Sequence, residues 1–190
     1  RSLLHALQRL DGSSAPASAW ESDILPGRFA NYDPAWLDLL CLSGRITWGR
    51  FMTQSAVRDD SDGRTRKPKT GPVKSTPINI IQRGNAELWR RLASTGNEPE
   101  PVLSSDAGLV RQVLAEKGAS FFLDIVEHTG LIRTRAENAL AELVSQGLVT
   151  SDSFAGMRAL LSPVNRKHRN GRTGKRRRTP YEIEDAGRWT

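Results

Sequence analysis

Apolar residues recur every three to four positions in three consecutive segments of the second half of the chain, which predicts three short amphipathic helices. Ser104 or Ser105 would cap the first helix and Gly118 would end it, while Ser120 and Gly130 would bound the second. The positions that form the three apolar faces are Leu109, Val110, Val113 and Leu114, then Phe121, Phe122, Ile125 and Val126, then Ala136, Leu140, Leu143 and Val144.

The third helix and the residues after it indicate a winged helix-turn-helix. Thr134 and Glu137 fit a capping box at the start of this helix, and Gly147 would end it. Residues 148–154 read as a short strand. We expect two more strands, at 157–161 and in the last segment, with a basic run between them as the loop of a β-hairpin. Three helices with a glycine-containing turn, followed by a hairpin, are typical of winged-helix units.

The first half repeats this order with a different sequence. In its third predicted helix, Asp33 is a suitable N-cap, Pro34 fits the first helical position and Gly44 closes the helix. A long polar loop rich in Asp, Gly and Pro separates two strand-like segments. The predicted elements are helices at 2–10, 18–25 and 33–44 and strands at 45–52 and 76–83.

We therefore predict a mainly α fold with small β-hairpins, an α+β class built from tandem winged helix-turn-helix units. The first unit covers 1–84, with a long wing loop at 54–75. A helical linker covers 85–103. The second unit covers 104–190, with a basic wing loop at 162–180.

The positive charge of the chain is local. The chain has 28 Lys and Arg against 21 Asp and Glu, a net charge of +7, and eight of those cations lie between Arg166 and Arg178 without an acidic residue. The remainder holds 20 basic and 21 acidic residues, so it is close to neutral. A local cluster of this kind indicates a contact surface for a polyanion.

The single cysteine, Cys41, excludes an intrachain disulfide, and we expect a reducing, cytoplasmic compartment and a packing role for this thiol. The three histidines are far from one another and from Cys41, so no zinc spacing exists and no metal site is expected. No apolar run approaches the ~20 residues of a membrane span, so no membrane partner is expected. The chain begins on Arg, and we interpret it as a piece of a longer protein.

Several blocks resemble a known family. WESDILPGRFANYDPAWLDLLCLSGRITWGRF, GASFFLDIVEHTG, ALAELVSQGLVTSDSFAGMRALL and the terminal AGRW are similar, in the same order, to the region after the helicase core of long bacterial Lhr (large helicase-related) proteins. The resemblance covers most of the chain and is weakest in the linker and the two long loops. It implies a bacterial parent protein that is an ATP-dependent superfamily 2 DNA helicase acting in repair. It also implies a tandem winged-helix array akin to that of AlkZ-type DNA glycosylases.

The residues themselves carry no recognisable catalytic chemistry, and whether the chain is enzymatic is left open. The string Gly171 to Arg176 is too short for a phosphate-binding loop and has Arg where the hydroxyl residue belongs. We therefore expect no cofactor in this fragment, and ATP and Mg²⁺ only in the helicase core of the parent. The paired glutamines of AlkZ-type enzymes are absent. The carboxylates weighed as base-excision candidates, and assigned to solvated or capping roles, are Glu21, Asp38, Asp124 and Glu127.

Nucleic-acid binding has the stronger support. The basic run would contact ~3–5 phosphates and produce a salt slope near −3 to −4. Trp20, Trp36, Trp48 and Trp89 would be able to stack on bases, but a core role is favoured for each. The predicted nucleic-acid-binding residues are Arg133, Thr134 and Arg135 at the start of the third helix, then Arg166, Lys167, Arg169, Arg172, Lys175, Arg176, Arg177 and Arg178 in the basic run, with auxiliary contacts from Arg64, Arg66, Lys67 and Lys69 in the first loop.

Two other functions are kept as alternatives. One is a protein-docking or oligomerisation module of the same helicase, in which the basic loop is only a solvated charge run. The other is a non-catalytic part of a glycosylase-like repair region. The expected partners are single-stranded or forked DNA and the other domains of the parent helicase, with RNA–DNA hybrids and self-association left open.

Overall fold

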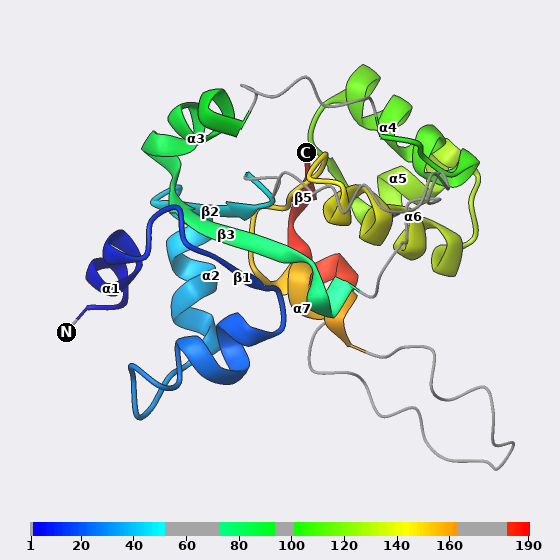
Figure 1. Ribbon diagram of the computed structural model, residues 1–190. Helices are drawn as coiled ribbons and strands as arrows, with labels where there is room; N and C mark the ends of the chain where they lie inside the picture. Colours follow the sequence, from blue (N-terminus) through cyan, green and yellow to red (C-terminus); the bar gives the residue numbers. More distant parts are fainter. Residues whose placement is uncertain (1, 52–72, 94–100, 163–181) are drawn as a thin grey trace, which may run out of the picture.

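A computed structural model describes residues 2–51, 73–93, 101–162 and 182–190. In the first half, a three-stranded antiparallel sheet has the order β1-β3-β2, formed by β1 (Ser14–Pro16), β3 (Pro77–Gln82) and β2 (Ile46–Gly49). Figure 1 shows helices beside this sheet. They are α1 (Leu3–Arg9), the π-helical turn η1 (Trp20–Ile24) and α2 (Pro34–Leu42).

Local sequence explains these elements well. The Asp33 side chain accepts a hydrogen bond from the Ala35 amide at 2.9 Å, and Pro34 occupies the first turn, so α2 begins as predicted. The predicted pairing of the two strand-like segments is also confirmed, with Trp48 opposite Ile80. Strand β3 is buried along Ile78 to Ile81 because it is the central strand, and its isoleucines suit that position.

In the second half, helices cover a two-stranded sheet. The helices are α4 (Ser105–Lys117), α5 (Phe122–Thr129), α6 (Arg133–Ser145) and α7 (Ala155–Leu161), and the strands are β4 (Ser120–Phe121) and β5 (Arg188–Trp189). A 3-10 turn, η5 (Ile183–Ala186), precedes β5. The helices α5 and α6 form the predicted helix-turn-helix, with Gly130 in a left-handed conformation (φ +66°) in the turn between them.

Two predicted helix caps are wrong. Ser120 does not cap α5, because it lies in β4; Phe121 occupies the N-cap position, and its amide donates to the Asp124 carboxylate at 3.3 Å. Thr134 does not form a capping box, because α6 already begins at Arg133 and Thr134 lies inside the first turn. Glu137 pairs with Arg133 instead, at 3.0 Å. Ser104 does cap α4, accepting from the Ala107 amide.

The predicted strand at 157–161 is also wrong, since this segment is helix α7. Its sequence, AGMRALL, has no β-branched residue, and five of its seven residues are buried, so a helix packed on several sides is the stable solution. The antiparallel pairing instead joins Thr150 and Asp152 to the end of the chain. Thr150 and Thr190 exchange backbone hydrogen bonds of 2.9 and 3.0 Å, and Ser151 bridges Trp189. The two long loops lie almost entirely outside the described residues.

The connection between the halves contains the expected short helix, α3 (Ala86–Ala93), which follows the 3-10 turn η3 (Arg83–Asn85). A further 3-10 turn, η2 (Val73–Ser75), leads into β3. Strand β1 was not expected from the sequence. Its three residues are too few to predict a strand, and they pair with the edge of β3 that β2 leaves free. In the described ranges, no helix is long and apolar enough to cross a membrane.

One hydrophobic core runs through both halves. Trp48 of β2 and Phe154, before α7, are buried against each other in an edge-to-face contact with ring centres 5.9 Å apart. The Trp48 indole donates to the Ser153 carbonyl at 3.0 Å, and the Thr150 hydroxyl donates to the Trp48 carbonyl at 2.6 Å. The Arg50 guanidinium adds a bond to the Ser145 carbonyl at 2.7 Å. The relative position of the halves is therefore set by direct packing.

Candidate nucleic-acid interface

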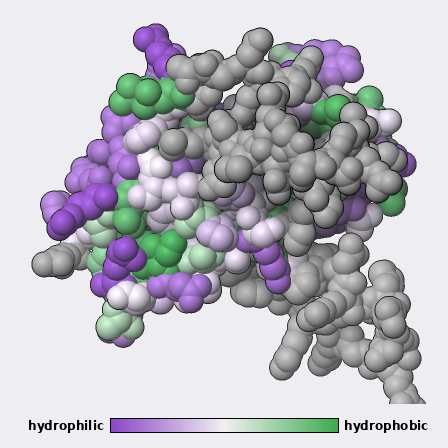
Figure 2. Space-filling model, viewed as in Figure 1, coloured by the Kyte–Doolittle hydropathy of each residue, from purple (hydrophilic) through white to green (hydrophobic). Residues whose placement is uncertain are grey.

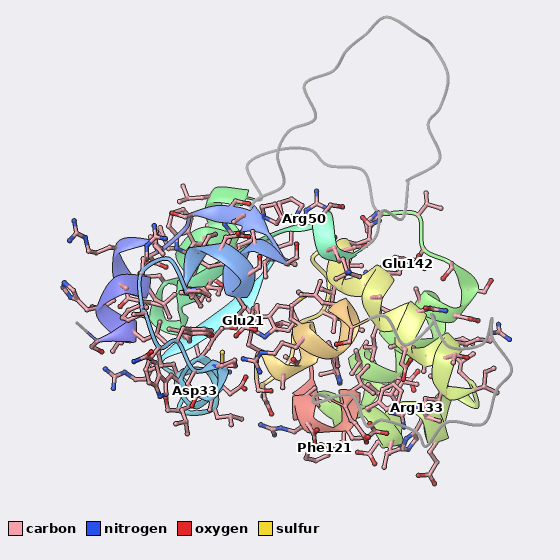
Figure 3. The ribbon with its side chains drawn as sticks, turned by 90° about the horizontal axis from the view of Figure 1, so that it is seen from below. Glu21, Asp33, Arg50, Phe121, Arg133 and Glu142 are labelled. Atoms are coloured by element: carbon pink, nitrogen blue, oxygen red, sulfur yellow. The ribbon has the colours of Figure 1, made fainter. Side chains whose placement is uncertain are left out.

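The start of helix α6 carries the described members of the predicted interface. Arg133, Thr134 and Arg135 are all exposed and occupy the first turn of the second helix in the helix-turn-helix. Figure 3 shows Arg133 at the end of the second half, beside η5. This position matches the prediction, but the charges around it change what these residues can do.

The Arg133 guanidinium is held by two carboxylates. It donates to Glu184 of η5 at 2.7 Å, with a second and shorter contact to the same carboxylate, and to Glu137 at 3.0 Å. It also lies 5.5 Å from the ring centre of Phe122. The hydrogen bond to Glu184 raises the pKa of Arg133, and burial opposes it only in part. Arg133 therefore ties α6 to η5 in the absence of nucleic acid.

The second arginine, Arg135, makes a similar pair with Asp106 of α4. Its Nε donates to Asp106 Oδ2 at 2.7 Å, and its Nη2 contacts the other carboxylate oxygen, which is the bidentate arrangement that arginine favours. The hydrogen bond from Arg135 holds the pKa of Asp106 below its usual range. Thr134 lies between the two arginines with an exposed side chain.

These pairs leave the helix-turn-helix without an excess of positive charge. In the second half, the described residues 101–162 and 182–190 hold ten Asp and Glu but six Lys and Arg. A phosphate backbone approaching such a surface would meet a net negative field. The described part of this unit therefore does not support groove reading by α6 as the main source of affinity.

The other predicted contacts lie outside the described residues. They are Arg64, Arg66, Lys67 and Lys69 in the first loop and Arg166, Lys167, Arg169, Arg172, Lys175, Arg176, Arg177 and Arg178 in the basic run. What the structure does describe is how the flanks of the basic run are held. Helix α7 ends at Leu161 before it, and η5 begins with the buried Ile183 after it. These two elements pack against each other.

The structure confirms the predicted core role for the tryptophans that are buried. Trp20 and Trp48 are fully buried, and the Trp20 indole donates to the Ile78 carbonyl at 3.2 Å. Trp89 packs on the backbone of Gly12. Trp36 is 42% exposed and makes an edge-to-face contact with Tyr32. Of these four, Trp36 is the one whose ring is open to a base.

The most constrained polar site in the described chain is one that the sequence analysis missed. Arg158 of α7 is 6% exposed, and its guanidinium donates to Glu21 at 2.6 and 2.9 Å and to Asp38 at 2.6 Å. A further bond reaches the Pro34 carbonyl at 3.0 Å, and Tyr32 donates to Glu21 at 2.6 Å. In Figure 3, Glu21 faces α7 across the junction of the halves.

This network corrects the roles given to two carboxylates. Glu21 and Asp38 are not solvated, because both neutralise a buried cation from the other half. Asp38 also accepts from the Ala155 amide at 3.0 Å, so it caps the start of α7. Burial would lower the pKa of Arg158, but the hydrogen bonds to Glu21 and Asp38 outweigh it and raise that pKa. The sequence did contain a signal for this site, a single arginine inside the apolar segment AGMRALL. Arginine is rarely buried without partners, so its position in a buried segment indicates carboxylates nearby in the fold.

Metal binding finds no support in the described geometry. Across residues 2–51, 73–93, 101–162 and 182–190, no group of three or more metal-ligating side chains comes together. His128 lies near the end of α5, where its Nδ1 contacts the Asp124 carbonyl at 2.7 Å. Burial raises the pKa of the Cys41 thiol to about 12, which suits a packing role.

Comparison with known proteins agrees with this architecture. A family model described as the winged-helix domain of large helicase-related protein matches residues 1–66. The Lhr helicase/uracil glycosylase of Escherichia coli is 27% identical over 175 residues, which is 92% of this chain and 10% of that protein. The predicted resemblance to the large helicase-related proteins is confirmed.

A second relative extends this result. The Lhr helicase/probable uracil glycosylase of Mycolicibacterium smegmatis is 28% identical over 173 residues, covering 86% of this chain and 10% of that protein. The chain thus spans about a tenth of the length of the curated relatives it matches. The similarity covers both halves, and the fold is of the predicted α+β class with a winged-helix domain.

Proposed function

We propose that this chain is a nucleic-acid-binding accessory region of an Lhr-like, ATP-dependent DNA repair helicase. It grips the DNA backbone and helps to hold single-stranded or forked DNA for a motor located elsewhere in the parent protein. Its own contribution is binding, and the ATP and Mg²⁺ of the reaction belong to the helicase core.

One observation carries this proposal. The basic run holds eight Lys and Arg without an acidic residue, and its flanking elements, α7 and η5, are packed against each other. The described residues on either side of the run, Leu161 and Ile183, thus belong to the folded body. Arg133 and Arg135 are already paired with carboxylates, and the basic run is the strongest concentration of positive charge in the sequence of the second half. Contacts of this kind bind phosphates with little sequence preference.

Fluorescence anisotropy with labelled single-stranded, duplex and forked DNA over a salt series tests the proposal. The variant replaces Lys175, Arg176, Arg177 and Arg178 with Ser. We expect its affinity to fall and the magnitude of its salt slope to shrink by about two or more, because each lost phosphate contact removes about 0.7–0.9 from the slope. The control variant replaces Arg64, Arg66, Lys67 and Lys69 with Ser, which removes the same number of positive charges from the first loop. We expect a smaller change in affinity and salt slope in this variant.

Equal binding by the parent chain and the Lys175–Arg178 variant, or no binding by either at low salt, would contradict the proposal. Docking to another domain of the parent would then become the leading function. That alternative has its own structural support. Leu39 and Leu42 on α2 and Leu88 and Leu92 on α3 are more than half exposed, and Figure 2 shows apolar surface over both helices.

The names of both relatives include uracil glycosylase, and base excision requires a carboxylate or an activated water beside a base pocket. In the described residues, Glu21 and Asp38 are engaged by Arg158, and Asp124 accepts from the Phe121 amide. We therefore restrict the proposed function of this region to binding. If the parent excises bases, the catalytic residues are expected outside the described part of this chain.

A further inference from the structure

A small cleft lies where the two halves meet, beside β2. This strand is at the end of the sheet order β1-β3-β2, so one of its edges has no partner strand. Residues 150–152 and the end of the chain form the opposite wall. The cleft has a volume of about 30 Å³ and is lined by Cys41, Ile46, Thr47, Arg83, Thr150, Ser151, Asp152 and Thr190.

Two arginines stand together at this end of the sheet. Arg45 precedes β2 and Arg83 follows β3, and the Arg83 amide donates to the Arg45 carbonyl at 3.1 Å, so the two residues are directly opposite. Side chains of directly opposite residues lie on the same face of an antiparallel pair. Both are exposed, and within the described part of the chain neither is paired with a carboxylate. Arg133, Arg135 and Arg158 are all compensated by acids, so this arginine pair is different.

Neutral donors complete the cleft. The Arg45 carbonyl accepts from the Arg83 amide and so points towards β3, which directs the Ile46 amide of the same peptide group to the unpaired edge of β2. Thr47 lies two residues from Arg45 and therefore on the same face of the strand. The hydroxyls of Thr150 and Ser151 already donate to the carbonyls of Trp48 and Ser153, so they help to shape the wall.

The lining holds one acidic side chain and, in the 190-residue chain, the terminal carboxylate of Thr190, one oxygen of which accepts from the Thr150 amide at 2.9 Å. The acidic side chain is neutralised. Asp152 Oδ2 accepts from the Arg188 guanidinium at 2.9 Å and from the Arg188 amide at 3.2 Å. Cys41 is a buried thiol whose pKa burial raises to about 12, so it remains uncharged. The lining therefore combines the Arg83 guanidinium, a hydroxyl and a backbone amide, with the Arg45 guanidinium beside it, and each carboxylate of the lining accepts a hydrogen bond.

We propose that this cleft binds a phosphate group, supplied by the backbone of a single-stranded nucleic acid. A volume of about 30 Å³ has room for roughly two water-sized atoms, which fits the terminal oxygens of a phosphodiester and excludes a base. Arginine forks match this geometry. The identity of the phosphate donor rests on the proposed nucleic-acid function, but the anion site does not. Free phosphate has the same recognition chemistry, and the experiment separates the two sources.

Two measurements on the full 190-residue chain test the inference. The first is a titration with inorganic phosphate at constant ionic strength, followed by two-dimensional ¹H–¹⁵N NMR. We expect saturable shifts of the Ile46, Thr47 and Arg83 amides in the parent chain and in an Arg28→Gln control. Arg28 is a suitable control because it is exposed and does not line the cleft. It precedes α2, and the cleft lies near the other end of that helix, at Cys41. In Arg83→Gln the shifts of the Ile46 and Thr47 amides should be lost.

The second measurement is anisotropy with a labelled oligothymidylate. We expect Arg83→Gln to weaken binding roughly fivefold at low salt and to reduce the magnitude of the slope by about 0.7, the value for one phosphate on a single strand. The Arg28→Gln control should bind like the parent chain. Arg45→Gln should produce a smaller loss in the same direction, because Arg45 stands beside the cleft and is not part of its lining.

The outcomes separate this inference from the proposed function. If phosphate shifts the cleft amides but Arg83→Gln binds the oligonucleotide normally, the anion site is supported and its ligand is free phosphate. If neither the basic-run variant nor the parent chain binds DNA, but phosphate still shifts the cleft amides, the proposed function fails and the anion site stands. If phosphate shifts no cleft amide and Arg83→Gln binds DNA like Arg28→Gln, the inference is overturned.

Discussion

The guanidinium of Arg158 donates two hydrogen bonds to the carboxylate of Glu21, 137 residues earlier in the chain. The pair joins α7 of the second half to η1 of the first, and Asp38 of α2 takes the remaining guanidinium nitrogen. A buried cation with two carboxylates contributes little net free energy, but it penalises any arrangement that separates the charges. We therefore interpret this network as a contact that fixes how the halves meet, together with the packing of Trp48 on Phe154.

Removal of this cation should destabilise the whole chain. We expect Arg158→Met to lower the free energy of unfolding by about 3–5 kcal/mol, because Glu21 and Asp38 would remain partly buried without a positive partner. Urea unfolding followed by circular dichroism measures this change. Arg28→Met removes an exposed arginine as a control and should cost under about 0.5 kcal/mol.

A triple variant tests the reason for that loss. When Arg158→Met is combined with Glu21→Gln and Asp38→Asn, no uncompensated charge remains, so a large part of the stability should return. Two results would contradict this role of the network. One is a loss of less than about 1 kcal/mol of unfolding free energy in Arg158→Met, and the other is a triple variant that is no more stable than Arg158→Met.

Cys41 should be chemically inert in the folded chain. Burial raises the pKa of its thiol to about 12, against about 8.5 for a free cysteine, so at pH 8 the reactive thiolate is scarcer by a factor of roughly 10³. We expect iodoacetamide labelling of the native protein to be slower by at least two orders of magnitude than labelling in guanidinium chloride. Similar rates in the two states would contradict the buried position of Cys41.

The pair between Arg135 and Asp106 should be visible in the titration of the aspartate. We expect NMR of the Asp106 carboxyl carbon to give a pKa below its usual range, and Arg135→Gln to return it towards the ordinary value. Since the folded pKa is the lower one, the stability that this pair contributes is complete above the unfolded pKa, near 4, and is lost as the pH falls through the folded pKa. An unchanged Asp106 titration in Arg135→Gln would exclude the pair in solution.

Gly12 should tolerate no side chain. Its φ of +80° is unfavourable for other residues, and a Cβ atom would lie 2.2 Å from the ring of Trp89. Gly118 has a similar φ of +77° but open space around it, so Gly118→Ala is a control that carries only the backbone cost, about 1–3 kcal/mol for a conformation that is essentially restricted to glycine. Thermal unfolding should show a clearly larger loss for Gly12→Ala. Equal losses would mean that Trp89 does not pack on this turn.

The sequence alone was sufficient where structure depends on neighbours along the chain. Asp33 and Pro34 start α2, Ser104 caps α4 and Gly130 makes the turn of the helix-turn-helix, because capping and left-handed glycine need only a few adjacent residues. The concentration of charge in the basic run is likewise a property of the sequence, and it carries the proposed function.

Tertiary structure decided everything that depends on distant partners. Segment 157–161 is a helix because it is packed between η5 and the first half, and the true partner of residues 150–152 is the end of the chain. The same holds for charge. Arg133 and Arg135 look like free DNA contacts in the sequence, but folding brings Glu184 and Asp106 to them, while Arg45 and Arg83 come together across two strands. Electrostatic character depends on distances in space, and only folding determines which charges are compensated.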